Sequence, residues 1–349
     1  MKYRTGFVVG KFAPLHFGHE LVINTALAQC EEVVVLSYTS RAFKNCSAAE
    51  RETWLKVRFP TPNIRIVVLD PDDYDLPDDD ADGDIQNQFC ANILLNYLHT
   101  TVQAVFSSED YGDGLAAHLA KYFTEELKCE QSVQHVMVDR KRWQLKISGT
   151  ELRDDANHAL REKFLAPQVR GAFIPKVLLL GGESSGKSTL AEALGEHLGT
   201  KVVPEYGRTL YEHRGGKLFF EDLEFIGKHQ ISNEDRASTF VKSGSVLICD
   251  TSALTTMFYS KQMFGRVSRA LQFLALNITS RYDIIYLCDP NIPFDQDGTR
   301  QDEAFRMLGH EWYIQRLARY KVPYTLVSGS VQDRVQQVSD DLKNRGAIK

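Results

Sequence analysis

Residues 176–198, KVLLLGGESSGKSTLAEALGEHL, constrain the fold of this chain more than any other segment. They place Gly181, Gly186, Lys187 and Ser188 in the spacing GxxxxGKS, between a short apolar run and a stretch of helix-forming residues. A glycine-rich turn between a strand and a helix presents backbone N–H groups and the positive end of the helix dipole to phosphate. The segment therefore predicts a strand, a phosphate-binding loop and a helix within a parallel α/β sheet.

Short apolar runs rich in β-branched residues alternate with helix-length segments along the whole chain. This spacing is typical of βαβ units, and because the pattern restarts at residue 176, it predicts an α/β protein with two doubly wound parallel-sheet domains. Pro167, Gly171 and Pro175 interrupt any continuous helix between them, so we expect a boundary near residue 170 and domains over 1–168 and 172–349. The expected strands are 6–12, 33–39, 64–70, 102–108 and 133–139, then 176–182, 201–207, 245–250, 284–290 and 324–329.

Composition excludes several classes of protein. The 349 residues include 41 Lys and Arg against 46 Asp and Glu, a formal net charge of −5, which is unlike a disordered tail or a supercharged nucleic-acid binder. No run approaches the roughly 18 apolar residues of a membrane span, and the first residues lack the pattern of a signal peptide. We therefore expect a cytoplasmic protein with no membrane insertion. The six cysteines form no CxxC pair, which predicts reduced and mostly packed thiols.

One segment has a biased composition. Residues 70–84, DPDDYDLPDDDADGD, contain nine aspartates. Proline and aspartate at this density predict a solvated surface loop after the third strand, because blocks of like charge repel one another and hydrate. A dedicated cation site is the alternative.

A first candidate phosphate site follows the first expected strand. Residues 10–19, GKFAPLHFGH, place His16 and His19 in the pattern HxGH before a helical stretch expected to begin at Glu20. A helix N-terminus favours phosphate, and two imidazoles three residues apart can reach the same anion. Gly18 lets a ligand approach the backbone closely. The competing interpretation is a pair of histidines satisfied within a strand-to-helix corner.

A second motif, ISGTELR at residues 147–153, follows the fifth expected strand at the head of another helix. Hydroxyls and amides at such a helix start can hold the far end of a triphosphate, and Arg153 adds a guanidinium fork. Ser148 and Glu151 also have the spacing of a capping box. Simple helix capping is therefore the alternative role, and both roles are compatible.

The GxxxxGKS loop is the second candidate phosphate site. We expect its amides to surround phosphates, Lys187 to reach the β and γ oxygens of a nucleotide, and Ser188 to hold Mg²⁺. The predicted nucleotide-binding residues are Gly181, Gly182, Glu183, Ser184, Ser185, Gly186, Lys187, Ser188 and Thr189.

Two carboxylates follow short apolar strands of the same half, where a small-molecule kinase needs them. Glu205 lies in VVPEYGR and Asp250 in VLICDT, and strand ends of such a sheet form the ligand crevice. One should help to hold Mg²⁺, and the other should accept the proton of a substrate hydroxyl. We assign Asp250 to magnesium and Glu205 to the base, and solvent-facing carboxylates are the alternative. Arg300, in FDQDGTRQDEAFR, suits a lid that brings a cation to the transferred phosphoryl group.

The pairing of GKFxPxHxGH with ISGTxxR across a five-stranded sheet resembles the nucleotidyltransferase superfamily, which transfers an adenylyl group from ATP to a phosphate or similar acceptor. An acceptor phosphate is already an anion, so the reaction needs positioning and charge stabilisation at the α-phosphorus, usually with Mg²⁺. The resemblance implies catalytic roles for Lys11, His16, His19 and Arg153. It also implies ATP contacts at Gly10, Phe12, Gly18, Ser148, Gly149 and Thr150.

The order of motifs over nearly the whole chain resembles the NadR-type bifunctional family, in which a nicotinamide-mononucleotide adenylyltransferase is joined to a ribosylnicotinamide kinase. The motifs are the HxGH segment, SSEDYG, VDRKR, ISGTELR, LGGESSGKSTL, PEYGR, DTSALTT and DGTR. The resemblance implies a Rossmann-like nucleotidyltransferase domain followed by a P-loop kinase domain, with ATP, nicotinamide riboside, nicotinamide mononucleotide and NAD as ligands. It makes Tyr206, Arg208, Phe294 and Asp297 candidates for substrate binding.

The sequence departs from that family in three places. The first strand begins by residue 6, which leaves no room for the helix-turn-helix repressor domain of some members, so we expect no nucleic-acid binding. Family members tend to place tryptophans after the acidic segment, where this chain has GDIQNQFCANI and only Phe89 or Tyr74 to stack on a nicotinamide ring. Phe294 stands where a tryptophan is usual in the lid.

Two other functions remain as alternatives. A pantetheine-phosphate adenylyltransferase fused to a dephospho-coenzyme-A kinase also joins an HxGH domain to a P-loop domain, although the PEYGR, DTSALTT and DGTR motifs argue against it. A nucleotide-sensing regulator would bind ATP and NAD with little turnover. The sequence is compatible with either a monomer or a homo-oligomer.

Overall fold

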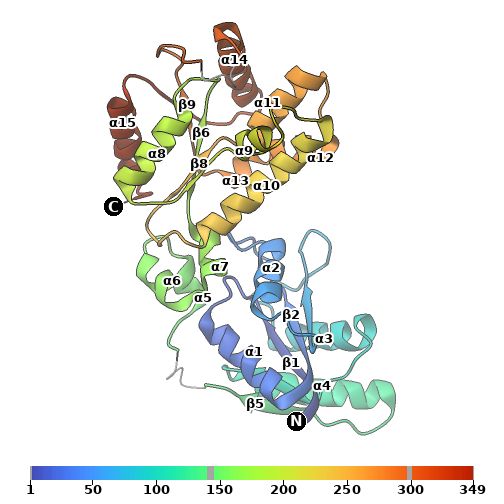
Figure 1. The fold of residues 1–349 in the computed structure, drawn as a ribbon. Helices are drawn as coiled ribbons and strands as arrows, with labels where there is room; N and C mark the ends of the chain where they lie inside the picture. The colour runs from blue at the N-terminus through green and yellow to red at the C-terminus, as the bar shows by residue number, and fades with distance from the viewer. Residues whose placement is uncertain (1, 140–144, 297–300, 349) are drawn as a thin grey trace. The chain divides into compact units, whose positions relative to one another are not determined.

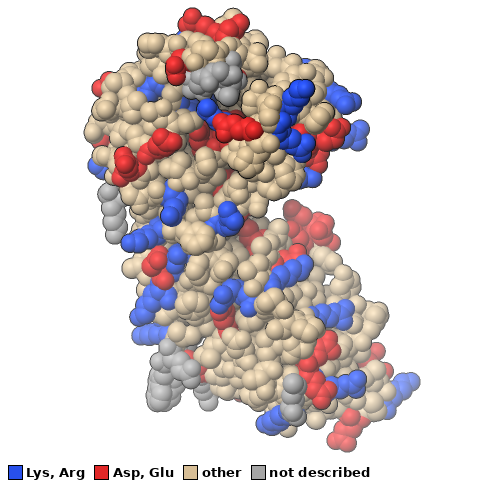
Figure 2. Space-filling view, in the orientation of Figure 1, with Lys and Arg blue, Asp and Glu red and all other residues tan. Residues whose placement is uncertain are grey.

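The computed structural model describes residues 2–139, 145–296 and 301–348. It divides into two compact units, Met1–Ala172 and Phe173–Lys349, and Figure 1 shows the fold of each. Among the described residues, no helix combines the length and the apolar character that a membrane crossing requires. On the face drawn in Figure 2, acidic and basic side chains are interspersed.

The first unit is built on a five-stranded sheet in the order β3-β2-β1-β4-β5, and every recorded pairing is parallel. All five expected strands are present. The strands are β1 (Tyr3–Gly10), β2 (Cys30–Ser37), β3 (Ile64–Val68), β4 (Ala104–Ser107) and β5 (Gln134–Met137). The helices are α1 (Phe17–Gln29), α2 (Ala48–Arg58), α3 (Gly83–Asn92), the π-helix η1 (Ile93–Tyr97), α4 (Tyr111–Leu127), α5 (Gly149–Arg153), α6 (His158–Phe164), α7 (Pro167–Arg170) and the 3₁₀ turn η2 (Gly171–Phe173).

Alternation along β2 explains how this sheet is covered. Val34 and Leu36 pack into one apolar cluster with side chains of α3, η1 and α4. Val33 and Val35 alternate with them and are also fully buried, while α1 and α2 pack against the strands. Continuous apolar strands of this kind are typical of a parallel sheet with helices on both faces.

The second unit has a five-stranded parallel sheet in the order β10-β9-β6-β8-β7. The strands are β6 (Lys176–Leu180), β7 (Val202–Val203), β8 (Leu247–Asp250), β9 (Ile284–Cys288) and β10 (Thr325–Val327), so all five expected strands are present. The helices are α8 (Lys187–Leu198), α9 (Tyr206–His213), α10 (Phe220–Ser238), α11 (Ala253–Phe264), α12 (Arg269–Leu276), α13 (Ile278–Arg281), α14 (Glu303–Arg319) and α15 (Val331–Asn344).

The central strand β6 divides the core of this unit into two clusters. Val177 and Leu179 pack with side chains of α8 and α15. Leu178 and Leu180 point to the opposite face and pack with side chains of α10 to α14. Both units therefore confirm the predicted α/β class with two doubly wound parallel sheets, and the carboxyl ends of their strands provide the crevices where ligands of such sheets bind.

The six cysteines are free thiols, and five of them are buried: Cys30, Cys46, Cys90, Cys249 and Cys288. This agrees with the expectation of reduced and mostly packed cysteines.

Candidate functional site

The HxGH motif of the first unit lies at the N-terminus of α1, which begins at Phe17 and not at Glu20 as predicted. The difference arises because His16 is the N-cap. Its Nδ1 accepts a hydrogen bond from the His19 backbone N–H at 3.3 Å, and His19 Nδ1 accepts one from the His16 backbone N–H at 3.4 Å. The two rings stack with centroids 3.6 Å apart. Since both Nδ1 atoms accept, the neutral rings carry their protons on Nε2 and can donate them.

The residues beside the histidines shape this corner. Gly18 lies close to the His16 ring, because a Cβ atom there would be 3.0 Å from it and the ring would have to shift by a few tenths of an ångström. Phe12 is 1% exposed, and its ring packs edge-on against His19 at 4.9 Å. A contact between Phe12 and ATP would therefore have to use its backbone. A Cβ at Gly10 would meet the Phe12 ring only at ordinary contact distance.

The ISGTELR motif meets the HxGH segment in space. Arg153 donates a hydrogen bond to the Ala13 carbonyl, and a Cβ at Gly149 would lie 3.0 Å from the same oxygen. Arg153 also donates to Thr150 Oγ1 at 3.1 Å. The predicted capping box is present, with Ser148 as the N-cap of α5 and Glu151 at its third position. The capping role is confirmed, while phosphate binding at this motif stays a prediction.

The acidic segment is partly different from the predicted solvated loop. Residues 70–82 are irregular, and α3 begins at Gly83. However, the Asp79 side chain is only 1% exposed and forms an ion pair with Lys11, Nζ to Oδ2, at 2.8 Å. Charge density predicted solvation for the whole segment, and it was wrong for Asp79 because hydrogen-bond donors after β2 and the Lys11 ammonium stabilise this carboxylate inside the protein.

The two aromatic residues proposed to replace a tryptophan lie at the edge of the core of the first unit. Phe89 packs edge-on against Tyr38, with centroids 4.9 Å apart. The Tyr74 hydroxyl lies 3.0 Å from that of Tyr97. Stacking of either ring on a ligand stays a prediction.

In the second unit the GxxxxGKS loop connects β6 to α8, as the sequence predicted. Gly186 caps α8 with a φ of +81°, a backbone conformation that favours glycine. A Cβ at Gly182 would lie 2.2 Å from the Arg306 carbonyl oxygen of α14. Lys187 Nζ donates to the Gly182 carbonyl at 2.8 Å, so the loop holds its own lysine across its opening.

Asp250 ends β8 beside this loop and is 3% exposed. Burial raises the pKa of its carboxyl, while the Lys187 charge and a hydrogen bond from Ser188 oppose the rise. Its Oδ1 atom is buried without a hydrogen-bond partner. A buried oxygen of this kind is an available ligand for a cation, and Ser188 lies beside it.

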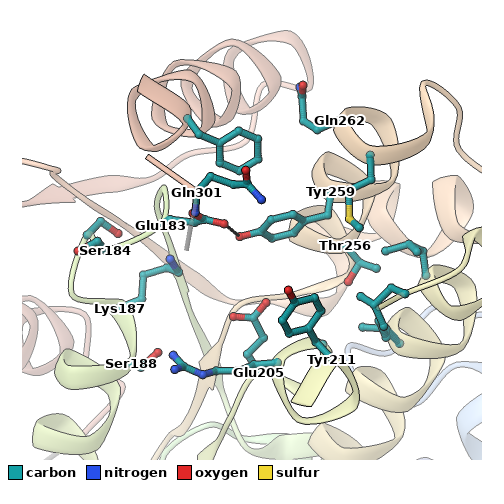
Figure 3. A pocket seen from close by; sticks show the side chains of 18 of the residues that line it. Glu183, Ser184, Lys187, Ser188, Glu205, Tyr211, Thr256, Tyr259, Gln262 and Gln301 are labelled. Carbon is teal, nitrogen blue, oxygen red and sulfur yellow. Dashed lines mark hydrogen bonds between the residues drawn. The ribbon is translucent and has the colours of Figure 1, made fainter. Parts of the chain in front are cut away.

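Glu205 precedes α9 and points into a cavity (Figure 3). Burial, and then the negative charge of Asp250, raise the pKa of Glu205 to about 7, although Lys187 and Arg208 act in the opposite direction. A carboxyl with this pKa exchanges its proton near neutral pH, which is what a general base requires.

The cavity has a volume of about 410 Å³ and extends from the GxxxxGKS loop to a wall formed by α9, α10 and α11. In Figure 3 the Glu183 carboxylate meets the Tyr259 hydroxyl across it, at 2.9 Å. The other carboxylate oxygen of Glu183 accepts the Gln301 backbone N–H at 2.8 Å. The site thus combines phosphate-binding groups at one end with a mixed aromatic and polar wall large enough for a nucleoside.

Several residues of this wall were not singled out from the sequence. Tyr259 and Met263 follow Thr256, the last residue of the DTSALTT motif, at helical spacing along α11, and this spacing is the signal that could have identified them. The other wall residues missed by the sequence analysis are Gly207, Tyr211, Leu218, Leu223, Ile226, Gln262, Gln301 and Phe305.

The predicted substrate residues have different positions. Arg208 lines the cavity and bonds Glu212 at 3.1 Å. The Tyr206 ring stacks on His229 of α10, 4.9 Å away, and is not part of the described lining. Phe294 lies 5.4 Å from the Arg306 guanidinium. Asp297 and Arg300 lie outside the described residues.

The chain is similar in sequence to one protein-family model and to two NadR proteins. Residues 176–334 match the model of the AAA domain family. The trifunctional NAD biosynthesis/regulator protein NadR of Salmonella typhimurium is 28% identical over 324 residues, covering 84% of this chain and 71% of that protein. The Escherichia coli protein of the same name is 28% identical over 328 residues, covering 86% and 72%.

Two crystal structures of NadR match the fold. One contains NR and has a TM-score of 0.67 at 21% identity; the other contains NAD and AMP-PNP and has a TM-score of 0.66 at 20% identity. Each alignment covers 99% of this chain and 97% of the solved chain. The chain is therefore a homologue of NadR and shares its fold of two parallel five-stranded sheets.

Proposed function

We propose that this chain is a bifunctional transferase of NAD biosynthesis. The unit around residues 172–349 phosphorylates nicotinamide riboside with ATP, and the unit around residues 1–168 adenylylates the resulting nicotinamide mononucleotide to NAD and pyrophosphate. Homology to NadR over both units supports this assignment. The two reactions also fit together chemically, because the product of the kinase is the substrate of the adenylyltransferase.

The observation that carries the proposal is the cavity that Lys187, Ser188 and the Glu205 carboxylate line together. A phosphate-binding loop alone is common to many nucleotide-binding proteins. A titratable carboxylate near that loop, in a cavity large enough for a nucleoside, is what transfer of a phosphoryl group to an alcohol requires.

In the kinase unit, Glu205 accepts the proton of the substrate hydroxyl. The hydroxyl oxygen forms a bond to the γ-phosphorus of ATP as the bond from that phosphorus to the bridging oxygen breaks, and ADP leaves. Lys187 stabilises the charge on the β and γ oxygens. The wall of α9, α10 and α11 excludes water and orients the riboside.

Asp250 and Ser188 suit a magnesium ion by their chemistry, since one contributes a hydroxyl oxygen and the other a buried carboxylate with an unpartnered oxygen. When bound with ATP, the ion would neutralise charge on the phosphates. We therefore assign Asp250 to the metal and Glu205 to the base, because Glu205 is among the residues that line the cavity, whereas Asp250 is buried and is not among them.

In the adenylyltransferase unit no general base is needed, because the phosphate of the mononucleotide attacks as an anion. The phosphate oxygen forms a bond to the α-phosphorus of ATP, and pyrophosphate leaves. The Nε2–H groups of His16 and His19, with Lys11 and Arg153, stabilise the charge that develops on the phosphates.

A product assay tests the proposal. Purified protein with Mg²⁺ and ATP receives nicotinamide riboside in one reaction and nicotinamide mononucleotide in another, and the nucleotides are separated by chromatography. We expect NAD in both. Turnover of pantetheine phosphate instead would support the coenzyme-A alternative, and binding of ATP and NAD without turnover of any substrate would support a regulator. Formation of the mononucleotide alone would restrict the proposal to the kinase.

A further inference from the structure

Lys11 is held at both ends. Its carbonyl oxygen accepts hydrogen bonds from Ser37 Oγ at 3.1 Å and from the buried Arg51 guanidinium at 3.3 Å. Its ammonium forms the 2.8 Å ion pair with Asp79. A lysine side chain ordinarily has many rotamers and loses entropy when it is fixed. Here contacts within the protein itself restrict the lysine.

Asp79 in turn is anchored by the residues that follow β2. Thr39 Oγ1 donates to its carboxylate at 2.9 and 3.0 Å, and the Ser40 backbone N–H donates at 3.0 Å. The Asp79 backbone N–H donates to Ser40 Oγ at 3.0 Å. Burial alone would raise the pKa of Asp79, but these donors and Lys11 lower it below its ordinary value. The carboxylate is therefore an ionised and immobile partner for Lys11.

The geometry leaves Lys11 available for an anion. An ammonium group has three N–H donors, and the ion pair uses one of them. The Lys11 side chain is 46% exposed whereas that of Asp79 is 1% exposed. The carboxylate is thus covered by the protein, and the lysine is the member of the pair that faces solvent.

Asp79 differs from other aspartates of the same segment. Asp80 is 74% exposed and pairs with Arg41. Asp72 is exposed, and the bond recorded for it joins its backbone N–H to Asp70 Oδ1. A change of Asp72 removes the same charge from the same loop at a position with no recorded contact to Lys11, which makes it a matched control.

We propose that Asp79 is a positioning residue for adenylyl transfer, which fixes the Lys11 ammonium where it stabilises the charge of the reacting triphosphate. The inference rests on the proposed function of the first unit. If it is correct, the acidic segment at residues 70–84 contributes to the adenylyltransferase site through the Asp79 carboxylate.

Kinetics of NAD formation from nicotinamide mononucleotide test the inference. Asp79→Asn keeps one oxygen, the acceptor that Thr39 and Ser40 share, but replaces the oxygen that pairs with Lys11 by an NH2 group and removes the charge. We expect kcat to fall about tenfold to hundredfold, as for misplacement of a catalytic group. The KM for ATP should change less than about threefold. Removal of the Asp79 charge weakens its repulsion of ATP, and this offsets the effect of a less fixed Lys11 ammonium. Asp72→Asn should behave as the wild type, and Asp79→Glu should recover part of kcat.

Repeating the Asp79→Asn change in the Lys11→Ala variant distinguishes a positioning role of Asp79 from a purely structural one. Asp79→Asn should lower kcat no further in that background, since the group it positions is gone. An equal loss in both backgrounds would overturn the inference in favour of loop stability. A lower KM for ATP with unchanged kcat would also overturn it, because Asp79 would then be masking Lys11.

A second measurement does not depend on turnover. In full-length protein labelled with ¹⁵N-lysine, a fixed ammonium gives a signal protected from rapid exchange with water. We expect a Lys11 signal, identified by its loss in Lys11→Ala, in the wild type and in Asp72→Asn but not in Asp79→Asn. If the wild type forms no NAD, the proposed function fails on that result alone, and this spectrum still decides whether Asp79 orders Lys11.

Discussion

The Glu205 carboxyl changes its charge within the working range of most enzymes, because burial and Asp250 raise its pKa to about 7. Only the ionised form can accept a proton. We therefore expect kcat for riboside phosphorylation to rise with pH, with a midpoint near pH 7, and to level off above about pH 8. Initial rates at saturating ATP and Mg²⁺ across this range measure it.

Glu205→Gln is the control for this pH profile. The amide has nearly the same shape but cannot accept the proton, so the variant should lose most of its kinase activity while NAD formation from the mononucleotide stays unchanged. A variant that keeps full kinase activity and the same pH midpoint would show that another group is the base.

The same pKa predicts a change in folding stability. An ordinary glutamate has a pKa of 4.5, so between pH 4.5 and about 7 the unfolded chain loses the Glu205 proton while the folded chain keeps it. Stability therefore falls as pH rises through this window and stays lower above it. Glu205→Gln removes this penalty.

We expect the free energy of unfolding of Glu205→Gln to exceed that of the wild type by about 1–2 kcal/mol at pH 8, with the gain reduced because the cavity admits water. At about pH 4 the difference should nearly disappear, because Glu205 is then mostly protonated in both states. Urea unfolding at the two pH values measures it. A gain of the same size at both would contradict the assigned cause.

At the scale of elements, the contact between the phosphate loop and α14 depends on Gly182. A Cβ there would lie 2.2 Å from the Arg306 carbonyl oxygen, and backbone cannot rotate away as a side chain can. We expect Gly182→Ala to displace the loop or the helix, to cost about 1–3 kcal/mol of stability, and to lower riboside phosphorylation more than tenfold.

Calorimetry and the two activity assays measure this effect. Gly83→Ala is a suitable control, since no atom lies within 4 Å of the added Cβ and the residue begins a helix. It should leave Tm and both activities near the wild-type values. Unchanged kinase activity in Gly182→Ala would mean that the loop can move without loss of function.

The sequence predicted those elements whose formation depends on local pattern. All ten strands were identified because their segments are short and rich in apolar or β-branched residues, a pattern that burial on both faces makes strongest in the inner strands of each sheet. The capping box of Ser148 and Glu151 was identified because it is a local exchange of hydrogen bonds. The start of α1 was placed three residues late, since histidine is not among the usual N-cap residues.

Features that depend on tertiary contacts could not be read in this way. Nothing in an aspartate-rich segment distinguishes Asp79 from its neighbours until Thr39 and Ser40 are placed beside it. The pairing of Glu183 with Tyr259 joins residues 76 positions apart. Motifs therefore indicated both candidate phosphate sites, whereas the residues that surround and support those sites could be identified only in the folded structure.

At the scale of the whole molecule, the proposal places two reactions in two compact units, each with its own core. We expect Lys187→Ala to abolish riboside phosphorylation and to leave adenylylation of the mononucleotide intact. His19→Ala should do the reverse, with a loss of stability of about 1 kcal/mol because His19 also caps α1. Product analysis with each substrate measures both.

Mixing the two variants gives the strictest test of this independence. Given nicotinamide riboside, His19→Ala alone should stop at the mononucleotide, and Lys187→Ala alone should form nothing. Together they should form NAD, because the mononucleotide released by one chain is a substrate for the intact adenylyltransferase of the other. NAD should then appear after a lag that shortens as the concentration of the Lys187→Ala chain increases. A mixture that accumulates the mononucleotide without forming NAD, although Lys187→Ala alone converts added mononucleotide, would mean that the intermediate has to pass between sites of one chain.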